Sequence, residues 1–324
     1  MINNLPLICL TVFIATFFLT VLFEIKLIPM LKNKAKQPIY EEGPSWHLNK
    51  TGTPTMGGLA FLLSISLSLT IAILYLLSNK KSSTAVSIMI SLLFAIGNSL
   101  IGILDDITKL RRQKNGGLTP MQKLFLQALL AIIFLMARKH FFSDGESFSF
   151  FLGKIDLRYL YYPLSFITLL GIVNCTNLTD GVDGLCATVA SAIGVVVLIA
   201  ANSLDTKLVF SAVAAGTIGF LLFNVNPAKI FMGDTGSLFL GGIIATLGFS
   251  VGNPLIVIIF GIVYVIEGIS VILQVLWFKL FRKRIFKMAP LHHHLEKSNI
   301  AENKICIIAL AITLISSLIA ITFI

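Results

Sequence analysis

Charged residues are scarce in this chain. Of its 324 residues, 12% are charged and 56% are hydrophobic, and the mean hydropathy is +0.92. A soluble protein of ordinary composition is about 25% charged, so this chain has too little charge to cover a surface that faces water. The composition therefore excludes a soluble globular domain. It also excludes a disordered chain, which requires low hydrophobicity and high charge.

Cysteine is also scarce. None of the four cysteines forms a CxxC pair with another, and this spacing argues against a zinc site or a disulfide scaffold. The 10 prolines and 24 glycines show no period, which excludes a collagen-like repeat.

Long apolar runs take up most of the chain. A membrane-spanning helix needs about 20 mostly apolar residues. Ten segments meet this description: residues 5–29, 56–78, 85–104, 120–137, 158–174, 185–202, 207–223, 236–250, 253–279 and 303–323. The first run is too long for the apolar part of a signal peptide, and no A-x-A cleavage site follows it. We therefore expect an all-α polytopic membrane protein with about ten transmembrane helices, forming a single domain over residues 1–324.

Basic residues are distributed unevenly between the two predicted sides. One side holds the segments 30–55, 105–119, 175–184, 224–235 and 280–302, and with the adjoining helix ends it carries 18 of the 25 Lys and Arg residues. Cytoplasmic loops carry such an excess, so this side is predicted to be cytoplasmic. An even number of spans then places both termini outside. The net charge of +10 follows mostly from this topology, which removes the case for nucleic-acid binding.

Two segments depart from plain transmembrane helices. Residues 147–161 carry apolar residues on both sides of Gly153-Lys154, a turn signal that predicts a small exterior β-hairpin. The apolar run 253–278 has 26 residues, about 39 Å as a helix against a hydrocarbon core of about 30 Å. That helix must tilt, bend or protrude into the cytoplasm, and Gly268 is a candidate bend point.

Five groups of polar residues interrupt the apolar pattern on the predicted cytoplasmic side. The first, HLNKTGTPTMGG at 47–58, precedes the second helix. Its backbone N–H groups, hydroxyls and the Lys50 ammonium suit a bound phosphate at a helix N-terminus. An ordinary capped turn explains the same residues without a ligand.

The second group, DDITK at 105–109, places Asp105 and Asp106 at a helix C-terminus, where they oppose the helix dipole. Binding of a divalent metal or proton transfer would account for this choice. The alternative is a solvated helix end in which Lys109 pairs with Asp105.

The third and fourth groups are rich in oxygen ligands and glycine. Residues 174–184 hold two Asn and two Asp, which suit Mg²⁺, although the spacing is not that of an EF-hand loop. Residues 224–237 hold Asp234 in a Gly-Asp-Thr-Gly-Ser turn, where one carboxylate can bind a metal, and Phe231, which can stack on a base. The fifth group, PLHHHLE at 290–296, suits a phosphate or pyrophosphate better than zinc, because adjacent His residues rarely converge on one metal.

Together these groups carry a resemblance to a known family. The motifs are HLNKTGTPTMGG (47–58), DDITK (105–109), NLTDGVDGL (177–185), FMGDTGS (231–237) and PLHHHLE (290–296). In this order, and over essentially the whole chain, they resemble the bacterial phospho-N-acetylmuramoyl-pentapeptide transferases, which belong to the polyprenyl-phosphate N-acetylhexosamine-1-phosphate transferases. The resemblance implies a Mg²⁺-dependent phosphoglycosyl transferase that converts UDP-MurNAc-pentapeptide and undecaprenyl phosphate to lipid I and UMP in peptidoglycan synthesis. It also implies a homodimer in the bacterial inner (plasma) membrane with a cytoplasmic active site.

The same resemblance assigns residues to roles. It implies catalytic roles for Asp105, Asp106, Asp234 and His293, and magnesium ligation by Asp234 together with Asn177. The implied substrate-binding residues are Lys50, Thr55, Lys109, Lys123, Asn174, Asp180, Asp183, Phe231, Gln274, His292 and His294. We expect Asp105 to act as the base toward the lipid phosphate and Asp106 to stay in an ion pair with Lys109. The sequence leaves open whether the reaction is a single displacement or passes through a covalent Asp intermediate.

Two other functions remain as alternatives. One is a transferase that uses UDP-GlcNAc and the same class of lipid acceptor. The other is a secondary transporter, for which Glu24 and Glu267 within predicted spans would mark a translocation path. Against the transporter, the polar groups gather at one membrane face and not at the midplane.

Overall fold

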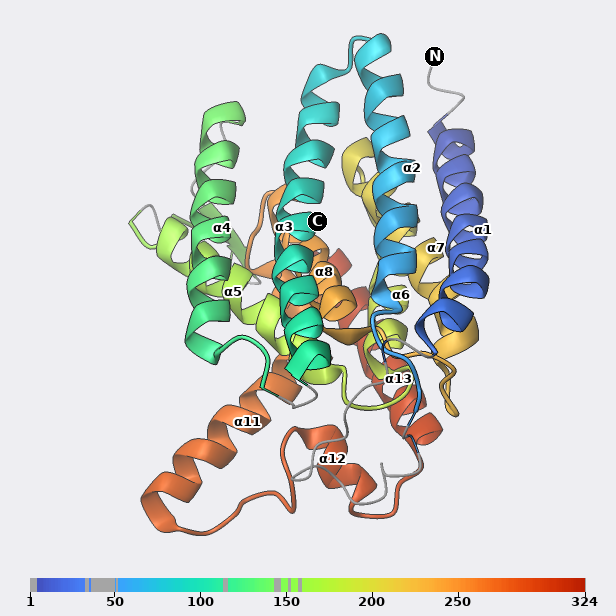
Figure 1. The fold of residues 1–324 in the computed structure, drawn as a ribbon. Coiled ribbons are helices and arrows are strands. Elements are labelled where there is room, and N and C mark those ends of the chain that lie inside the picture. Colours follow the sequence, from blue (N-terminus) through green and yellow to red (C-terminus); the bar gives the residue numbers. More distant parts are fainter. Residues whose placement is uncertain are drawn as a thin grey trace.

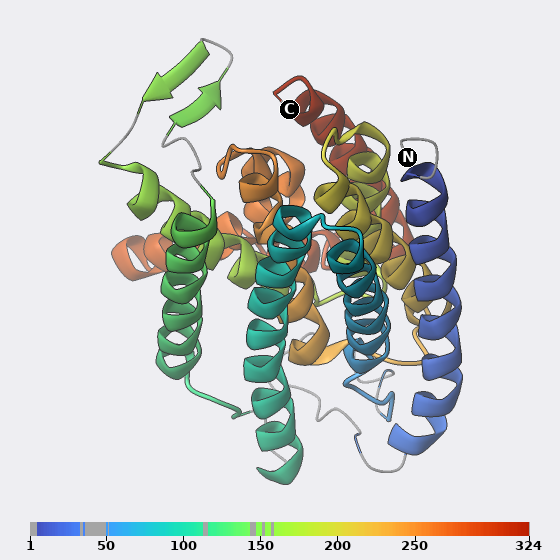
Figure 2. The same cartoon turned by 90° about the horizontal axis from the view of Figure 1, so that it is seen from above.

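The structure is a computed structural model that describes residues 5–32, 35, 50, 52–112, 116–142, 147–150, 153–156 and 159–323. Its elements, in chain order, are α1 (Leu5–Leu31), α2 (Gly58–Ser78), α3 (Ser82–Arg112), α4 (Pro120–Phe141), β1 (Ser147–Phe150), β2 (Gly153–Asp156), α5 (Tyr161–Thr179), α6 (Leu185–Ala200), α7 (Leu204–Asn224), α8 (Gly233–Ala245), α9 (Leu247–Ser250), α10 (Ile256–Phe260), α11 (Ile262–Phe281), α12 (Leu291–Glu296) and α13 (Glu302–Ile321). The helices form one bundle (Figure 1), and the two strands lie apart from it (Figure 2).

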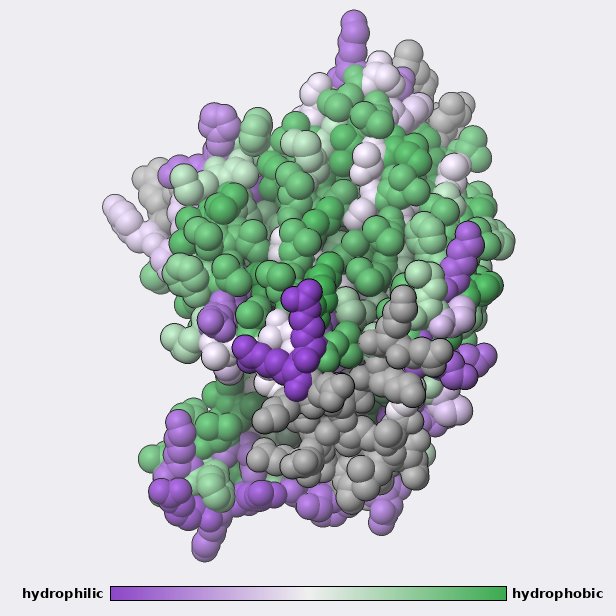
Figure 3. Space-filling view, viewed as in Figure 1, coloured by the Kyte–Doolittle hydropathy of each residue, from purple (hydrophilic) through white to green (hydrophobic). Residues whose placement is uncertain are grey.

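The bundle has the dimensions and surface of a membrane protein. Within the described residues, seven helices are long and apolar enough to cross a membrane: α1, α2, α3, α4, α7, α11 and α13. The face shown in Figure 3 is hydrophobic over most of the helical bundle, with hydrophilic side chains gathered toward its ends. The all-α membrane architecture expected from the sequence is therefore confirmed.

Three further predicted spans fall on α5, on α6 and on residues 236–250, which divide into α8 and α9. The predicted span 253–279 is also broken, into α10 and α11 at Gly261. Between these pairs, Gly252 adopts a left-handed φ of 74°, and Pro254 has no N–H to continue a helix. Apolar composition alone does not reveal such breaks.

The expected bend at Gly268 is wrong. Gly268 lies inside α11, and a Cβ atom there would be 2.2 Å from the Cys175 Sγ atom on α5. This glycine therefore serves the close approach of two helices, and the break occurs earlier, at Gly261. The expectation that this segment protrudes is met, because α11 leaves the bundle at the end where α12 lies (Figure 1).

The strands β1 and β2 pair antiparallel, with Phe150 opposite Gly153. This register places Gly153 and Lys154 in β2 and not in the turn, where the sequence had placed them. The turn signal therefore located the hairpin about two residues too late.

Helix α8 is the centre of the bundle, and glycines allow its neighbours to approach it closely. All residues from Thr235 to Ala245 are buried. A Cβ atom on Gly58 of α2 would lie 2.2 Å from the Gly236 Cα atom, and one on Gly102 of α3 would lie 2.2 Å from the Asp234 carbonyl oxygen. Small residues at helix contacts are the usual way to pack helices in a membrane. Here they fix the N-terminus of α8 against the C-terminal part of α3.

This packing predicts opposite effects for two glycine substitutions. Gly102→Ala should destabilise the protein by roughly 1–3 kcal/mol, because the added methyl group would overpack the contact between α3 and α8. Gly171→Ala is the matched control: no atom lies within 4 Å of its Cβ position on α5, and alanine is the better helix former by about 1 kcal/mol. Apparent unfolding temperatures in detergent would test this, and equal shifts in the two variants would contradict the packing.

Candidate active site

Three aspartates from two helices meet at one end of the bundle. Asp105 and Asp106 lie near the C-terminus of α3, and Asp234 lies in the first turn of α8. One carboxylate oxygen from each residue lies within 4.8 Å of the others, and Asp105 and Asp106 are buried. At 31 residues, α3 is about 46 Å long, which exceeds the hydrocarbon thickness of about 30 Å and lets its end leave the apolar region.

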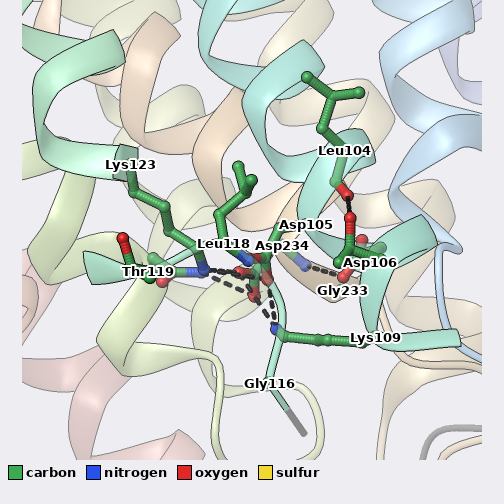
Figure 4. Close-up of polar contacts among 12 residues, drawn as sticks. Leu104, Asp105, Asp106, Lys109, Gly116, Leu118, Thr119, Lys123, Gly233 and Asp234 are labelled. Atoms are coloured by element: carbon green, nitrogen blue, oxygen red, sulfur yellow. Dashed lines mark hydrogen bonds and ion pairs between the residues drawn. The ribbon is translucent and has the colours of Figure 1, made fainter. Parts of the chain in front are cut away.

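Two lysines bridge these carboxylates (Figure 4). The Lys109 Nζ atom lies 2.7 Å from Asp105 Oδ2 and 3.3 Å from Asp234 Oδ2. The Lys123 Nζ atom lies 2.9 Å from Asp105 Oδ2 and 2.5 Å from Asp234 Oδ2. We call Asp105, Asp106, Asp234, Lys109 and Lys123 the acidic cluster. With three carboxylates and two ammonium groups, it carries one net negative charge when all five groups are ionised.

Asp106 has a different task from Asp105. Its Oδ1 accepts the Asp234 N–H at 3.1 Å, and its Oδ2 accepts the N–H and the hydroxyl of Thr235 at 2.9 Å and 2.7 Å. These are N–H groups of the first turn of α8, which have no partner within the helix and favour a negative charge. Asp106 thus caps α8 from the neighbouring helix.

The expected ion pair between Asp106 and Lys109 is therefore wrong. Lys109 pairs with Asp105, because residues four apart lie on one face of a helix. The side chain of Asp106 points to α8 instead, where Gly233 makes room for it. Gly233 has a left-handed φ of 71°, and a Cβ atom there would lie 2.6 Å from Asp106 Oδ2.

The start of α4 places Lys123 in the cluster. Thr119 and Gln122 form a capping box, in which each side chain accepts the backbone N–H of the other residue, and Pro120 is the first helical residue. Just before this cap, the Leu118 N–H donates to Asp105 Oδ1 at 2.7 Å. The cap and this hydrogen bond fix the first turn of α4 beside α3.

The donor set fits a divalent cation that prefers oxygen ligands, such as Mg²⁺. Three carboxylates converge, and one oxygen from each lies within 4.8 Å of the others, a grouping that could hold a metal ion. Asn177 is adjacent, but its Nδ2 donates to Asp234 Oδ1 at 3.2 Å and to Ser237 Oγ at 2.8 Å. In this arrangement, Lys109 and Lys123 contact oxygens of Asp105 and Asp234.

A second ionic network lies around Lys50. Its Nζ atom is 2.7 Å from Asp183 Oδ1 and 2.7 Å from Glu302 Oε2. Asp183 Oδ2 also accepts the Asn226 Nδ2–H and the Ala228 N–H, at 3.2 Å and 3.0 Å. Burial lowers the pKa of Lys50, but the hydrogen bonds to Asp183 and Glu302 outweigh it, so the pKa lies above its ordinary value. Lys50, expected to meet a phosphate, here joins four segments of the chain.

Asp180 faces the acidic cluster from the loop between α5 and α6. Burial raises its pKa well above the ordinary value, and the negative charges of Asp234, Asp106 and Asp183 raise it further. Its charged form is therefore costly in the protein without ligands. A bound cation or a donor from a substrate would favour that charged form.

The other predicted site residues have intramolecular partners. The Asn174 Nδ2–H donates to Gln127 Oε1 at 2.8 Å. The Gln274 Oε1 atom accepts the N–H groups of Ile285 and Phe286, at 3.2 Å and 2.9 Å. Thr55 is buried, and its Oγ1 lies 2.9 Å from the position that a Cβ atom on Gly233 would take.

The loop before α2 and the start of α8 are joined by the backbone. The Phe231 N–H donates to the Pro54 carbonyl, and the Phe231 carbonyl accepts the Gly57 N–H, each at 2.8 Å. This pairing places Thr55 and Phe231, predicted from separate motifs, at the same end of the bundle.

The three histidines differ from one another. His292 is fully buried, and its N–H donates to Glu267. His293 Nδ1 lies 2.6 Å from Glu296 Oε2, and His294 Nδ1 accepts the Lys287 N–H at 3.1 Å. The residues that sequence reasoning missed are mostly partners of predicted ones: Thr235, Glu302, Asn226, Gln127 and Glu267. Of these, Glu267 carried a signal as an ionisable residue within an apolar run, and Thr235 and Asn226 lie within the polar segment 224–237.

Comparison with known proteins defines the class. Residues 88–252 match the model of glycosyl transferase family 4, and residues 50–62 match signature 1 of phospho-N-acetylmuramoyl-pentapeptide-transferase. The chain is thus a member of glycosyl transferase family 4, with helices that are long and apolar enough to cross a membrane.

Relatives along the full chain narrow the assignment. The phospho-N-acetylmuramoyl-pentapeptide-transferase of Halalkalibacterium halodurans is 41% identical over 313 residues, which cover 95% of each chain. Those of Staphylococcus carnosus and Staphylococcus aureus are 42% and 43% identical, over 94% and 90% of this chain and 96% and 92% of theirs. The chain belongs to the phospho-N-acetylmuramoyl-pentapeptide-transferase family.

Two aspartates in one loop should respond oppositely to the same substitution. Asp183→Asn should lower the apparent unfolding temperature, because hydrogen bonds to a charged group contribute about 1.5–3 kcal/mol and several are lost. Asp180→Asn should raise it, since the raised pKa of Asp180 makes its charge unfavourable in the folded state.

The pH dependence separates the two variants further. The unfolded pKa of Asp is about 3.9, so the penalty from Asp180 is absent below about pH 4 and grows as the pH rises toward the folded pKa. The gain from Asp180→Asn should therefore be larger at pH 8 than at pH 5 in thermal unfolding without ligands. A gain that is constant across this range would contradict the unfavourable charge at Asp180.

Proposed function

We propose that this protein transfers phospho-MurNAc-pentapeptide from UDP-MurNAc-pentapeptide to undecaprenyl phosphate, which gives lipid I and UMP in peptidoglycan synthesis. The observation that carries the proposal is the 41% identity to a phospho-N-acetylmuramoyl-pentapeptide-transferase over 95% of both chains. Formation of lipid I and UMP by the purified protein tests it. An assay with UDP-GlcNAc in parallel distinguishes the alternative transferase, and activity with UDP-GlcNAc alone would refute the proposal.

The acidic cluster supports a phosphoryl transfer. In such a reaction, catalysis consists mostly of positioning and of neutralising negative charge on the phosphates. Mg²⁺ would supply that neutralisation, held by Asp105, Asp106 and Asp234. Lys109 and Lys123 are placed to contact phosphate oxygens once their carboxylate partners bind the cation.

The roles proposed for the remaining residues follow from their positions. Asp180, Asp183 and Phe231 would line the nucleoside end of the site, beside the Lys50 network. The rest of the proposed substrate site consists of Thr55, Asn174, Gln274 and His294, with His293 as a further catalytic residue. The buried His292 would support this site through the loop that it contacts. Asn177 would support the cation through Asp234.

We propose an electrostatic role for Asp105. Its carboxylate accepts the Leu118 N–H and contacts both lysine ammonium groups, so it is placed to orient these cations. A polyprenyl phosphate has a second pKa of about 6, as other phosphomonoesters do, and is mostly dianionic at neutral pH. A general base toward the lipid phosphate is therefore of little use at that pH.

This role predicts a pH-independent defect in Asp105→Asn. The kcat should fall by about 10²–10³, as on loss of a preorganised electrostatic group, and by the same factor at pH 6.5 and pH 9. Asp205→Asn, at the opposite end of α7 from the site, is the matched control and should retain activity. Recovery of Asp105→Asn at pH 9, where the substrate is fully ionised, would instead assign Asp105 as the base.

We further propose that the site faces the cytoplasm, that the chain crosses the membrane ten times and that the hairpin lies outside. The excess of Lys and Arg on the side of the acidic cluster supports this orientation. A cysteine introduced at Arg284, in a cysteine-free background, should react with a membrane-impermeant reagent only from the cytoplasmic side, and one at Lys81 only from outside. The reverse labelling pattern would overturn the orientation.

The resemblance also supports a homodimer in the bacterial inner membrane. Light scattering of the detergent-solubilised protein, corrected for bound detergent, should give twice the chain mass of 35.4 kDa. A mass of one chain in detergent and in nanodiscs would refute the dimer.

A further inference from the structure

Glu267 is a buried carboxylate that lies outside the acidic cluster. It sits in the first half of α11, and its two oxygens each accept the backbone N–H of His292 at 3.1 Å. The His292 Nδ1 atom also lies 3.1 Å from Glu267 Oε2. A buried carboxylate is costly in a membrane protein unless it is paired, so this contact defines where α12 joins α11.

The part of α11 that carries Glu267 is held firmly against α5. Gly268 is packed on Cys175, at the 2.2 Å approach described above. The Ser270 hydroxyl donates to the Glu267 carbonyl at 2.6 Å. Through Glu267, the segment of α11 that packs on α5 also holds the first turn of α12 in place.

The His292 imidazole contacts the loop between α5 and α6. A Cβ atom on Gly181 would lie 2.2 Å from His292 Nε2, 3.0 Å from Cε1 and 3.2 Å from Cδ2. The ring edge therefore rests directly on the Gly181 backbone, between Asp180 and Asp183. Because His292 is fully buried, it reaches the site through this loop and not through its own surface.

We propose that Glu267 is a positioning residue of the transferase: it holds the His292 imidazole against Gly181 and so fixes the loop that presents Asp180 and Asp183 to the nucleotide. The proposal rests on the proposed function, because that function assigns the two aspartates to the nucleoside end of the site. It gives Glu267 and His292 one shared effect on nucleotide binding.

Kinetics of the full-length protein test the functional part. Glu267→Gln and His292→Ala should each raise the KM for UDP-MurNAc-pentapeptide by about tenfold or more, while the KM for undecaprenyl phosphate stays within about twofold. The double variant should be no worse than the poorer single variant, since Glu267 acts on the loop only through the His292 ring that His292→Ala removes. Glu24→Gln is the matched control, because Glu24 is a buried glutamate of another helix, α1.

A steric exchange gives a readout that general destabilisation would not produce. Gly181→Ala introduces a methyl group at the position of His292 Nε2 and should itself raise the KM for the nucleotide. In the Gly181→Ala background, His292→Ala removes the clashing ring. The KM of the double variant for the nucleotide should therefore rise by less than the product of the increases in the two single variants. Independent, multiplicative effects of these substitutions, or equal increases in both KM values for Glu267→Gln, would overturn the proposal.

Hydrogen exchange separates a failure of this proposal from a failure of the proposed function. Without any substrate, Glu267→Gln and His292→Ala should speed amide exchange in residues 180–184, whereas Glu24→Gln should not. Unchanged exchange in this loop would overturn the proposal even if the wild type forms lipid I. If the two variants exchange faster but the wild-type protein forms no lipid I, the proposed function is refuted and the coupling of Glu267 to the loop still holds.

Discussion

The arrangement of the site end of the bundle depends on the two lysine ammonium groups between Asp105 and Asp234. Two carboxylates within 4.8 Å of each other repel by roughly 3 kcal/mol at an effective dielectric constant of about 20. Lys109 from α3 and Lys123 from α4 convert this repulsion into four short contacts. Three helices that would otherwise be pushed apart are held together at the place where the charge is needed.

The remaining polar contacts keep this cluster in position. Asp106 caps α8 from the neighbouring helix, close glycine contacts fix the position of α8, and the Lys50 network ties the loop after α5 and the loop after α7 to α13. The Asp106 cap and the Lys50 network each pair a charge with a partner that is distant in sequence. In the proposed transfer, a bound divalent cation and phosphates would replace contacts that the two lysines now make.

Much of this could be predicted from the sequence, and the limits have physical causes. The apolar runs indicated the positions of the long helices. The four-residue spacing of Asp105 and Lys109 predicted their ion pair, as an alternative to a role in metal binding or proton transfer. The break at Gly261 could not be predicted, because the residues on both sides of it are equally apolar and composition does not show where one helix ends and the next begins. Nor could the partner of Lys50: Glu302 lies 252 residues away, and only the packing of α13 against α6 brings it near. Asp106 was misassigned because its hydrogen-bond donors, Asp234 and Thr235, belong to another helix. Sequence spacing reports only on contacts within one helix.

The central claim is that Asp105, Asp106 and Asp234 form one divalent-cation site at the end of the bundle. The most direct measurement is the binding of Mn²⁺, as a surrogate for Mg²⁺, to the purified full-length protein by electron paramagnetic resonance, compared between the wild type and Asp234→Asn. The account predicts one bound ion per chain that Mg²⁺ displaces, and its loss in Asp234→Asn while the unfolding temperature shows that the variant is folded. Equal binding by the two proteins would contradict the account.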